Sequence, residues 1–517
     1  MTSRQRSITR AAATLAGSVA LALTMSACTG TDDAGGGAPK TTLTVVIAGQ
    51  PKSLNPAEAS NGITFVTDLS YASLIDVDED GELIPGLATA WEYVGDTNTQ
   101  LQVTLRDGVK YSDGTPMDAA SVAGSINYFT TGNSASVGAW VGITAEPVDD
   151  STVLLTSATP NPIMPLLLTP NYLGGDVIAP AGVADPDSLQ NATLGAGPYK
   201  LDPEQTVAGD HYTYVPNENY WDQDAIAWEK VTLQVITSTT SAVQALSTGQ
   251  VDFVFGDVNT VDAAKAGGAE VLSAPLYWNG FFLLDRDGTI APALADVRVR
   301  QAMNYAIDRQ LIVDTIYRGQ ASVTHQPETP GWDAYDESLD DTYPYDPDKA
   351  RELLAAAGYA DGLTMTVNYG GFTAEQESLV QAMAAQLGEV GITIELRNSG
   401  NDYATDLYSL KYPLTSLPFG GQPQFANATQ GFLHNGSLNP FNAVDPKLQA
   451  LFDEYVAAPT EEQAAKAKAV EKYIVDQALS LPVAVANANF FVSPRLDHVA
   501  LTPTGALTNI RTWTPAS

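Results

Sequence analysis

The residues best suited to binding a ligand gather in one stretch, 412–444, whose 33 residues include no Asp, Glu, Lys or Arg in a chain that is 16% charged. The stretch combines aromatic rings, glycines and prolines with the neutral amides of Asn and Gln. Flat apolar faces and amides that both donate and accept hydrogen bonds suit an uncharged or weakly charged molecule. On this stretch alone two interpretations stay open: a neutral surface loop, or one wall of a ligand cleft.

Residue patterns that would support catalysis or metal binding are missing from the sequence. The chain has no Gly-x-Ser-x-Gly motif, and Gly195-Ala196-Gly197 lacks the third glycine of a nucleotide-binding loop. Carboxylates are so abundant that a glycosidase-like pair stays open from their number, but no two of them stand out. We therefore expect a binding protein without cofactor or metal rather than an enzyme. The four histidines are far apart and show no paired helical spacing for a metal: His211, His325, His434 and His498.

Length and charge limit the class of protein. A chain of 517 residues exceeds one hydrophobic core, so two or three domains are expected. Sixty acidic residues against 25 basic ones give a net charge of −35, which disfavours nucleic acid and anionic membrane surfaces as partners. Acidity of this size keeps a protein soluble, and we expect a monomer.

The N-terminus has the features of an export signal. Three arginines within the first ten residues precede an apolar run, 11–25, that is too short for an ordinary membrane-spanning helix. The run ends at Ser26-Ala27-Cys28, which looks like a lipoprotein box, and Cys28 is the only cysteine. The alternative is a plain secretory signal with an incidental cysteine. We expect a signal peptide and lipidated Cys28 over 1–28, a flexible tether over 29–40, and an extracytoplasmic protein held to the outer face of the bacterial membrane by its lipid.

Periodicity and turn residues predict alternating strands and helices in the first half of the chain. Apolar residues alternate at 43–47 and 101–105, as in half-buried strands. A short helix is predicted over 65–75, and Asp118 is a suitable N-cap for a helix that continues through Phe129.

A strand–helix–strand unit is predicted between 363 and 396. Thr373 opens its helix, with Gln376 three residues later in a capping-box arrangement. Such a unit implies parallel strands and a right-handed crossover. Three further helices are expected. One is capped by Asp346, with Pro347 at its first position and Gly358 at its end; one begins at Asp296 and has Val299, Met303, Ile307 and Leu311 on one face; and one begins at Thr460 with Gln463 in a second capping box. An apolar strand is expected over 481–492.

Several ordered blocks carry a family resemblance. They are Leu83-Ile84-Pro85-Gly86-Leu87-Ala88, Trp91, Leu105-Arg106-Asp107-Gly108-Val109-Lys110-Tyr111, Ser112-Asp113-Gly114-Thr115-Pro116, Gly195-Ala196-Gly197-Pro198-Tyr199, Asn219-Tyr220-Trp221-Asp222, Asp296-Val297-Arg298-Val299-Arg300-Gln301-Ala302 and Tyr345-Asp346-Pro347-Asp348-Lys349-Ala350-Arg351. Together they resemble the extracellular solute-binding proteins of the peptide/nickel class (family 5), which feed ABC importers, and they cover nearly the whole mature chain.

The resemblance implies an α/β, two-lobed periplasmic-binding-protein-like fold of the cluster C type. Such a protein captures a small organic solute by lobe closure and delivers it to an ABC permease and ATPase. The implied parts are lobe I over 41–78, 192–274 and 490–517, an extra subdomain inserted in the first lobe over 79–191, lobe II over 275–489, and crossing segments near 276–284 and 481–492.

Ligand-binding candidates come from four places in this arrangement. For the aromatic candidates the alternative interpretation is core packing, and for the glutamines it is a solvated loop. The candidates are Gln50, Ser53 and Asn61, which follow the first strand; Trp140, at the mouth of the cleft; Trp278 and Asn279, on the first crossing segment; and Phe419, Gly420, Gly421, Gln422 and Gln424, in the neutral stretch.

The chain departs from the family in one way that concerns the ligand. Peptide binders of this class commonly have an aromatic-rich segment with an Asp that pairs with the ligand's α-amino group, whereas the corresponding segment, 417–424, has no acid. A buried ammonium without a counter-charge is costly. Either a carboxylate from elsewhere supplies the pairing, Asp402 or Asp406 being conceivable, or the ligand has no amine there. Peptide is the default class, with a neutral oligosaccharide, an opine or another non-peptide solute as the alternative, and a secreted hydrolase or a sensor as rivals.

Overall fold

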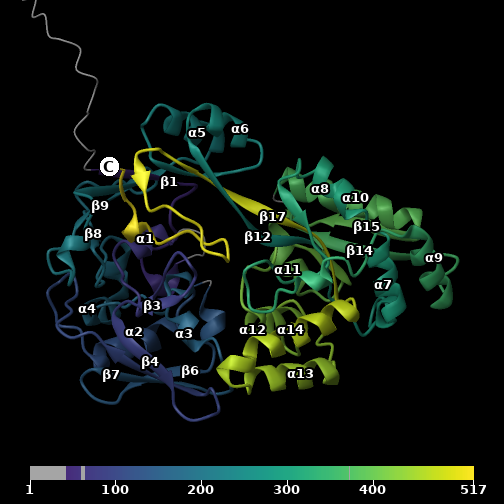
Figure 1. The fold of residues 1–517 in the computed structure, drawn as a ribbon, viewed down its shortest axis with the longest axis horizontal. Coiled ribbons are helices and arrows are strands. Elements are labelled where there is room, and N and C mark those ends of the chain that lie inside the picture. The colour runs from purple at the N-terminus through teal and green to yellow at the C-terminus, as the bar shows by residue number, and fades with distance from the viewer. Residues whose placement is uncertain (1–41, 60–63, 135, 372, 517) are drawn as a thin grey trace, which may run out of the picture. The chain divides into compact units, whose positions relative to one another are not determined.

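Two long antiparallel strands, β12 (Glu270–Leu283) and β17 (Ser480–Val492), lie side by side and join the two ends of one mixed sheet (Figure 1). The computed structural model describes residues 42–59, 64–134, 136–371 and 373–516, so the expectations for 1–40 and for Asn61 lie outside the described residues. The 11-stranded sheet has the order β15-β14-β16-β12-β17-β11-β1-β10-β9-β8, with β13 paired to β17. Its other strands are β1 (Thr42–Ile47), β8 (Tyr199–Leu201), β9 (His211–Pro216), β10 (Lys230–Val235), β11 (Phe253–Gly256), β13 (Ala321–Val323), β14 (Leu363–Tyr369), β15 (Ile392–Asn398) and β16 (Leu414–Ser416).

One end of the sheet, with strands β1 and β8–β11, forms what we call the first lobe. The predicted strand 43–47 is confirmed as β1, which pairs in parallel with β10. The apolar side chains of these strands pack with the C-terminal segment, as Phe253 of β11 does with Trp513, their ring centroids being 4.8 Å apart. Helices α1 (Phe65–Asp68), α5 (Thr239–Ser247) and α6 (Val261–Ala266) belong to this lobe.

A separate four-stranded antiparallel sheet, in the order β4-β5-β7-β6, forms the inserted subdomain with its own core. Its helix α2 (Ala119–Phe129) begins as predicted at Asp118, which accepts from the backbone N–H of Ser121 while the Ser121 hydroxyl accepts from the N–H of Asp118. The predicted strand 101–105 is confirmed within β5. The strands are β4 (Ala88–Tyr93), β5 (Gln100–Leu105), β6 (Ile143–Pro147) and β7 (Thr152–Ser157).

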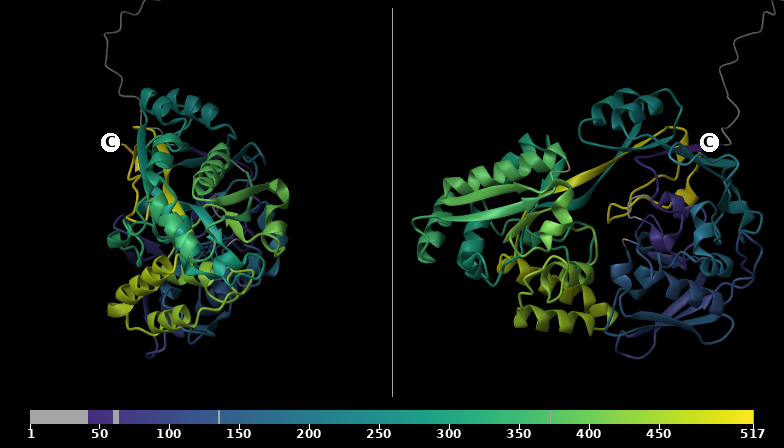
Figure 2. Two further views of the ribbon diagram at one scale, coloured as in Figure 1. Left: turned by 90° about the vertical axis from the view of Figure 1, so that its right-hand side faces the viewer. Right: turned by 180° about the vertical axis from the view of Figure 1, so that it is seen from behind.

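The other end of the large sheet, with β13–β16, forms the second lobe. The predicted strand–helix–strand unit is confirmed, since β14 and β15 pair in parallel and α10 (Ala374–Glu389), capped by Thr373, connects them. Figure 2 shows α10 beside these strands and β17 leading from this lobe to the first. The expected residue bounds of the lobes stay predictions. The remaining longer helices are α7 (Val297–Tyr305), α8 (Arg309–Thr315), α9 (Pro347–Ala356), α13 (Pro446–Val456) and α14 (Thr460–Asp476).

Three local predictions are wrong. The helix expected over 65–75 ends after one turn, at Asp68, and the chain then pairs with a distant segment: the Leu74 N–H donates to Gly175 O (3.0 Å) ahead of strand β2 (Ile75–Val77). The helix from Asp296 ends at Tyr305, and Asp308 caps a new helix. Leu311 lies in this second helix, where it is 51% exposed instead of extending the apolar face of the first. The helix predicted to start at Thr460 is confirmed as α14, but the capping box is wrong, because Thr460 is the first residue of the helix and its cap is Pro459.

Other predicted element boundaries are confirmed. Asp346 caps α9, Pro347 is its first residue, and Gly358 follows it with a φ of +91°. The apolar strand expected over 481–492 is β17. Among the described residues, no helix combines the length and apolar character that crossing a membrane requires.

Candidate functional site

The segment that follows β16 is fixed against strand β12 at Trp278. The Trp278 N–H donates to Phe419 O (2.7 Å), and the Phe419 N–H donates to Trp278 O (3.0 Å). Both rings also contact Phe282, at centroid distances of 4.7 Å for Trp278 and 5.1 Å for Phe419. Trp278 is fully buried in the core of the second lobe, whereas Phe419 is partly exposed, so the two aromatic candidates meet but differ in access.

Gly420 and Gly421 turn the chain where side chains would not fit. Their φ angles are +103° and +67°, which favour glycine. A Cβ on Gly420 would lie 3.0 Å from Trp278 Cδ1 and 3.2 Å from Thr329 Cγ2, and one on Gly421 would lie 2.5 Å from Leu276 O. The Trp278 indole N–H and the Thr329 hydroxyl are buried beside this turn without a hydrogen-bond partner in the described part of the chain.

The amides of the neutral stretch form a chain of hydrogen bonds that leads away from the turn. Gln422 Nε2 donates to Asn427 Oδ1 (3.0 Å), and Asn427 Nδ2 donates to Glu328 Oε2 (2.8 Å). The backbone N–H of Gln424 donates to Asp333 Oδ1 (2.9 Å). Gln422 is partly exposed, whereas Asn427 and Gln424 are buried, so Gln422 is the amide at the accessible end of this network.

Three carboxyl groups stand behind the neutral stretch: Glu328, Asp333 and Glu471. The Glu328 N–H donates to Glu471 Oε1 (3.0 Å). With its amide nitrogen turned toward the acids, Gln424 donates to Oε2 of both glutamates at 3.3 Å. Burial raises the pKa of Glu471 to about 8 and holds the pKa of Glu328 well above its usual range, where the charges of Glu471 and Asp333 raise it further. Burial also raises the pKa of Asp333.

The inserted subdomain lies against this part of the second lobe. Burial raises the pKa of Tyr172, and the nearby carboxylates of Asp333 and Glu328 raise it further. Phe425, in the short helix α12 (Gln424–Asn427), packs against the apolar cores of both the inserted subdomain and the second lobe. The neutral stretch is therefore placed where the two parts meet.

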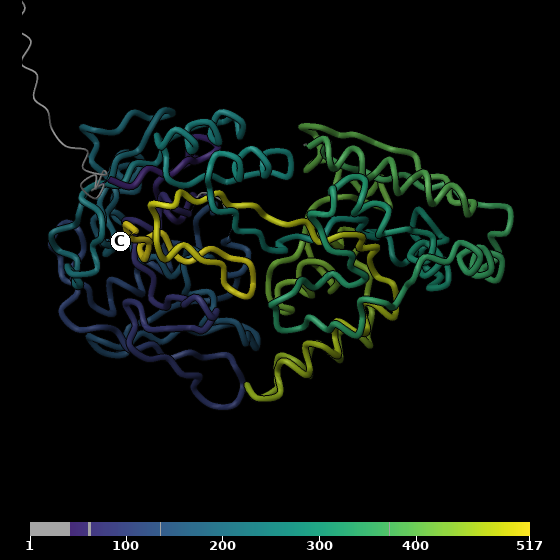
Figure 3. The backbone as a smooth tube through the Cα atoms, turned by 45° about the horizontal axis from the view of Figure 1, so that its top comes forward, coloured from purple at the N-terminus to yellow at the C-terminus, as the bar shows by residue number. Residues whose placement is uncertain are grey.

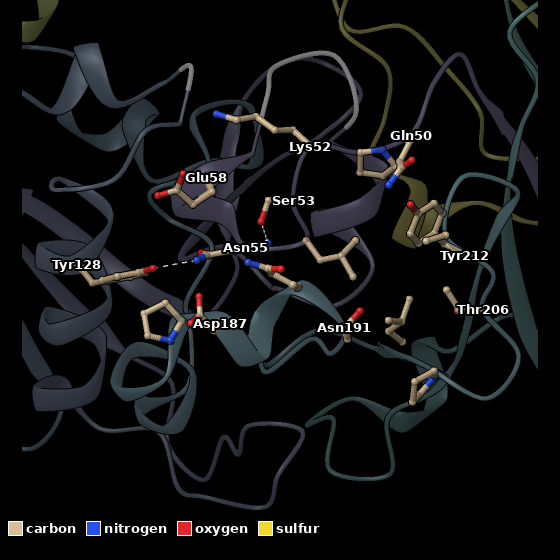
Figure 4. A pocket seen from close by; sticks show the side chains of 17 residues that line it. Gln50, Lys52, Ser53, Asn55, Glu58, Tyr128, Asp187, Asn191, Thr206 and Tyr212 are labelled. Carbon is tan, nitrogen blue, oxygen red and sulfur yellow. Dashed lines mark hydrogen bonds between the residues drawn. The ribbon is translucent and has the colours of Figure 1, made fainter.

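Gln50 lies elsewhere, in a pocket of about 590 Å³ (Figure 4). The pocket is lined by the turn after β1, by Tyr128 at the end of α2, and by the loops 186–191 and 201–212. Asn55 Nδ2 donates to the Tyr128 hydroxyl at 2.8 Å and joins two of these segments. Ser53 also lines the pocket, but no candidate from β12 or from 417–424 does.

The remaining candidates do not join either group. Trp140 is fully buried in the core of the inserted subdomain, where its ring lies 5.6 Å from that of Phe129 and leaves no space for a Cβ on Gly174. Asn279 is partly exposed on β12 and pairs with Ala484 beside a register shift. Asn61 lies outside the described residues.

The two acids expected as alternative amine partners are also placed. Asp406 accepts from the Ser399 hydroxyl (2.6 Å) and pairs with Arg397 at 3.5 Å, whereas Asp402 is exposed at the end of a short helical turn. Neither has a hydrogen bond to segment 417–424 in the described residues. The acids that contact this segment are Asp333, Glu328 and Glu471.

Comparison with known proteins decides the family. Residues 82–439 match the family described as bacterial extracellular solute-binding proteins, family 5 Middle. The chain belongs to this family. Such proteins are the substrate-binding components of ABC importers, and they bind solutes rather than transform them. The two-lobed periplasmic-binding-protein-like fold expected from the sequence is confirmed.

Relatives within family 5 differ in their ligands. The chain is 26% identical to the nickel-binding periplasmic protein of Escherichia coli K12 over 370 residues, which covers 66% of this chain and 68% of that protein. It is 24% identical over 497 residues to the periplasmic murein peptide-binding protein MppA of the same organism, covering 86% and 88%. Among solved structures, the substrate-binding protein CtaP of Listeria monocytogenes has a TM-score of 0.78 at 22% identity, covering 93% of this chain and all of that one.

Sequence reasoning missed the three acids behind the neutral stretch. Glu328, Asp333 and Glu471 are among sixty acidic residues, and none of them lies in a recognisable motif. Glu328 and Glu471 are 143 positions apart, so only the folded chain brings them together. A lone buried acid gives no periodic signal, because the same residue type is abundant on the surface.

Proposed function

We propose that this chain is the lipid-anchored, extracytoplasmic substrate-binding subunit of an ABC importer, and that it captures a small solute of the peptide class between its lobes. The membership in family 5 supports the transport role. The proposed anchor is Cys28, and the proposed partners are the ligand, a permease and an ATPase, with the membrane reached through the lipid alone. Gln422, Phe419 and the Gly420-Gly421 turn are proposed to face the solute.

The acids behind the neutral stretch are the reason for proposing a ligand of the peptide class. Segment 417–424 has no acid of its own, but its Gln424 N–H bonds to Asp333, which is partly exposed. Neither Asp333 nor the two buried glutamates forms an ion pair with a Lys or Arg in the described part of the chain. An unpaired carboxylate at a ligand site attracts an ammonium group, and a peptide has one at its N-terminus.

A neutral solute is the second candidate, and the amide network supports it. Gln422 Nε2 donates to Asn427 Oδ1, and Gln430 Nε2 approaches Gln422 Oε1 at 3.5 Å, which together present uncharged donors and acceptors beside Phe419. Amides and an aromatic face are the groups that bind sugar hydroxyls and the apolar faces of sugar rings.

A melting-temperature screen tests the function and separates the two ligand classes. Saturating solute should raise the melting temperature by mass action, by an amount equivalent to about 2.7 kcal/mol at a hundred times Kd. We expect Ala-Ala-Ala and longer peptides to raise it, and maltotriose and opines to leave it unchanged. If only the sugar raises it, the peptide class is wrong.

Asp333→Asn gives a sharper test of the amine contact. Since Asn keeps the shape of Asp but not its charge, this variant should lose most of its response to Ala-Ala-Ala while N-acetylated peptide is unaffected. The matched control is Asp341→Asn, an exposed position in the following loop, which should respond like the unmodified protein. Equal responses in both variants would show that Asp333 does not pair with the peptide amine.

A further inference from the structure

The turn between β4 and β5 contacts the end of helix α13, although the two are far apart in sequence. Asn98 Nδ2 donates to Val456 O (3.0 Å) and approaches Ala458 O (3.4 Å), across 358 and 360 positions. The turn belongs to the inserted subdomain and α13 belongs to the second lobe. Figure 3 shows the early, purple turn beside the yellow-green end of α13, away from the paired strands β12 and β17.

The turn that carries Asn98 is also fixed by bonds within its own subdomain. Its φ of +50° lies in the left-handed region, which Asn tolerates better than most residues, and this turns the backbone sharply. The Asn161 N–H donates to Asn98 O (2.9 Å), and the Tyr93 hydroxyl donates to Asn161 O (2.7 Å). The turn is thus tied to a neighbouring loop of its own subdomain, so little freedom is lost when the Asn98 amide meets α13.

The end of α13 is a suitable acceptor. The last carbonyl groups of a helix have no partner within it and carry the negative end of the helix dipole, which favours an N–H donor. Gln463 Nε2 donates to the same Ala458 carbonyl at 3.1 Å, so this end of the helix is held from two sides.

The contact is also linked to the candidate ligand site. Tyr455 directly precedes Val456, and its hydroxyl donates to Asp333 Oδ2 (3.0 Å). Asp333 in turn accepts from the Gln424 N–H. Two hydrogen bonds therefore connect the helix end that Asn98 binds to the segment that we propose to face the solute, and Phe425 in that segment packs against both parts.

We propose that Asn98 is a positioning residue for solute capture: it stabilises the closed arrangement, in which the inserted subdomain meets the second lobe, without contacting the solute. Its role in capture rests on the proposed function, whereas its effect on closure does not. One hydrogen bond of this kind changes an equilibrium about 3- to 10-fold. Loss of the side chain should lower the ratio of closed to open molecules by that factor, and solute affinity should fall with the closed population.

Asn98→Gly tests the proposal, because Gly keeps the left-handed turn and removes only the amide. Small-angle X-ray scattering of the protein without solute should give a larger radius of gyration for this variant than for the unmodified protein. Asn98→Asp, which places a carboxylate against the same carbonyls, should increase it at least as much. The control is Thr97→Ala in the same turn, whose exposed side chain bonds to Thr99 and, among the described residues, to nothing outside the turn. The radius of this variant should not change.

Melting temperatures separate closure from folding. We expect all three variants to melt within a few degrees of the unmodified protein, since the contact joins two parts that each have their own core. Equal radii for Asn98→Gly and the unmodified protein would overturn the proposal. A variant that melts much earlier would also overturn it, because Asn98 would then serve folding. Failure to find any solute would instead count against the proposed function and would leave the scattering result intact.

Discussion

Replacing Glu471 by Gln should remove much of the pH dependence of stability in the second lobe. Glu471 is 0% exposed within α14, and its Oε1 accepts from the N–H of Glu328, which is also 0% exposed. Burial raises the pKa of Glu471 to about 8 and keeps the pKa of Glu328 well above its usual range. Two carboxyl groups this close, out of water, are stable only while protons neutralise them.

The sign and size of the effect follow from the pKa of Glu471 in the two states. In the unfolded chain the pKa is near 4.5, so the folded state holds its proton more tightly. The resulting stability is fully present below about pH 4.5 and is lost as the pH rises through 8. Each pH unit between the two values corresponds to about 1.4 kcal/mol, which gives at most about 5 kcal/mol for this group. Gln has no proton to lose, so the variant avoids this loss.

Urea unfolding at pH 5, 6, 7 and 8 measures the effect. The unmodified protein and Glu471→Gln should have free energies of unfolding within about 1 kcal/mol at pH 5, and the variant should be more stable by several kcal/mol at pH 8. Glu461→Gln, an exposed position in the first turn of the same helix, is the control and should not change the slope. Parallel pH profiles for Glu471→Gln and the unmodified protein would refute a protonated buried pair.

Two further predictions concern the solute and the first lobe. Gln422→Ala should weaken binding of the solute about 5- to 10-fold with little change in unliganded melting temperature, because the side chain is partly exposed and its partners among the described residues are other amides. Unchanged affinity in a titration would remove Gln422 from the site. Asp68→Asn should gain at most about 3 kcal/mol of unfolding free energy over the unmodified protein between pH 5 and pH 8, since burial raises the pKa of Asp68 from 3.8 to about 7 and its stabilising neutral form is lost as the pH rises through that value. Asp80→Asn, at an exposed position, is the control, and equal slopes in urea unfolding would contradict the interpretation.

Elements with strong local signals could be predicted from the sequence. Asp118, Asp346 and Thr373 begin their helices as expected, because a side-chain acceptor before a helical run satisfies free N–H groups whatever the rest of the fold does. The parallel pairing of β14 and β15 followed from the strand–helix–strand order of this part of the sequence. Local patterns do not reveal long-range pairing, so the helix predicted over 65–75 was wrong: Leu74 bonds to Gly175 instead of continuing the helix.

The candidate site was predictable only in part. Composition identified the neutral stretch, and the resemblance placed it in the second lobe and made Trp278 and Phe419 candidates, but neither predicted that these two residues would pair. Whether an aromatic residue packs in a core or lines a site depends on neighbours that are distant in sequence. Trp140 illustrates this, since Gly174 and Phe129 enclose it in the subdomain core. Glu328, Asp333 and Glu471 could not be assigned to segment 417–424 for the same reason, because they too are distant from it in sequence.

The absence of an acid in 417–424 gains a physical explanation from what lies behind the segment. Glu328, Asp333 and Glu471 already contact it through Gln424 and Asn427, and burial, together with the charge of Asp333, raises the pKa of each glutamate. A further carboxylate in the segment would add a like charge to this group and raise those pKa values again, at a cost in stability. Neutral amides can instead hydrogen-bond both the acids and a solute. A charge-free segment is therefore compatible with binding an amine, provided that the charge comes from Asp333, and this is the feature that Asp333→Asn removes.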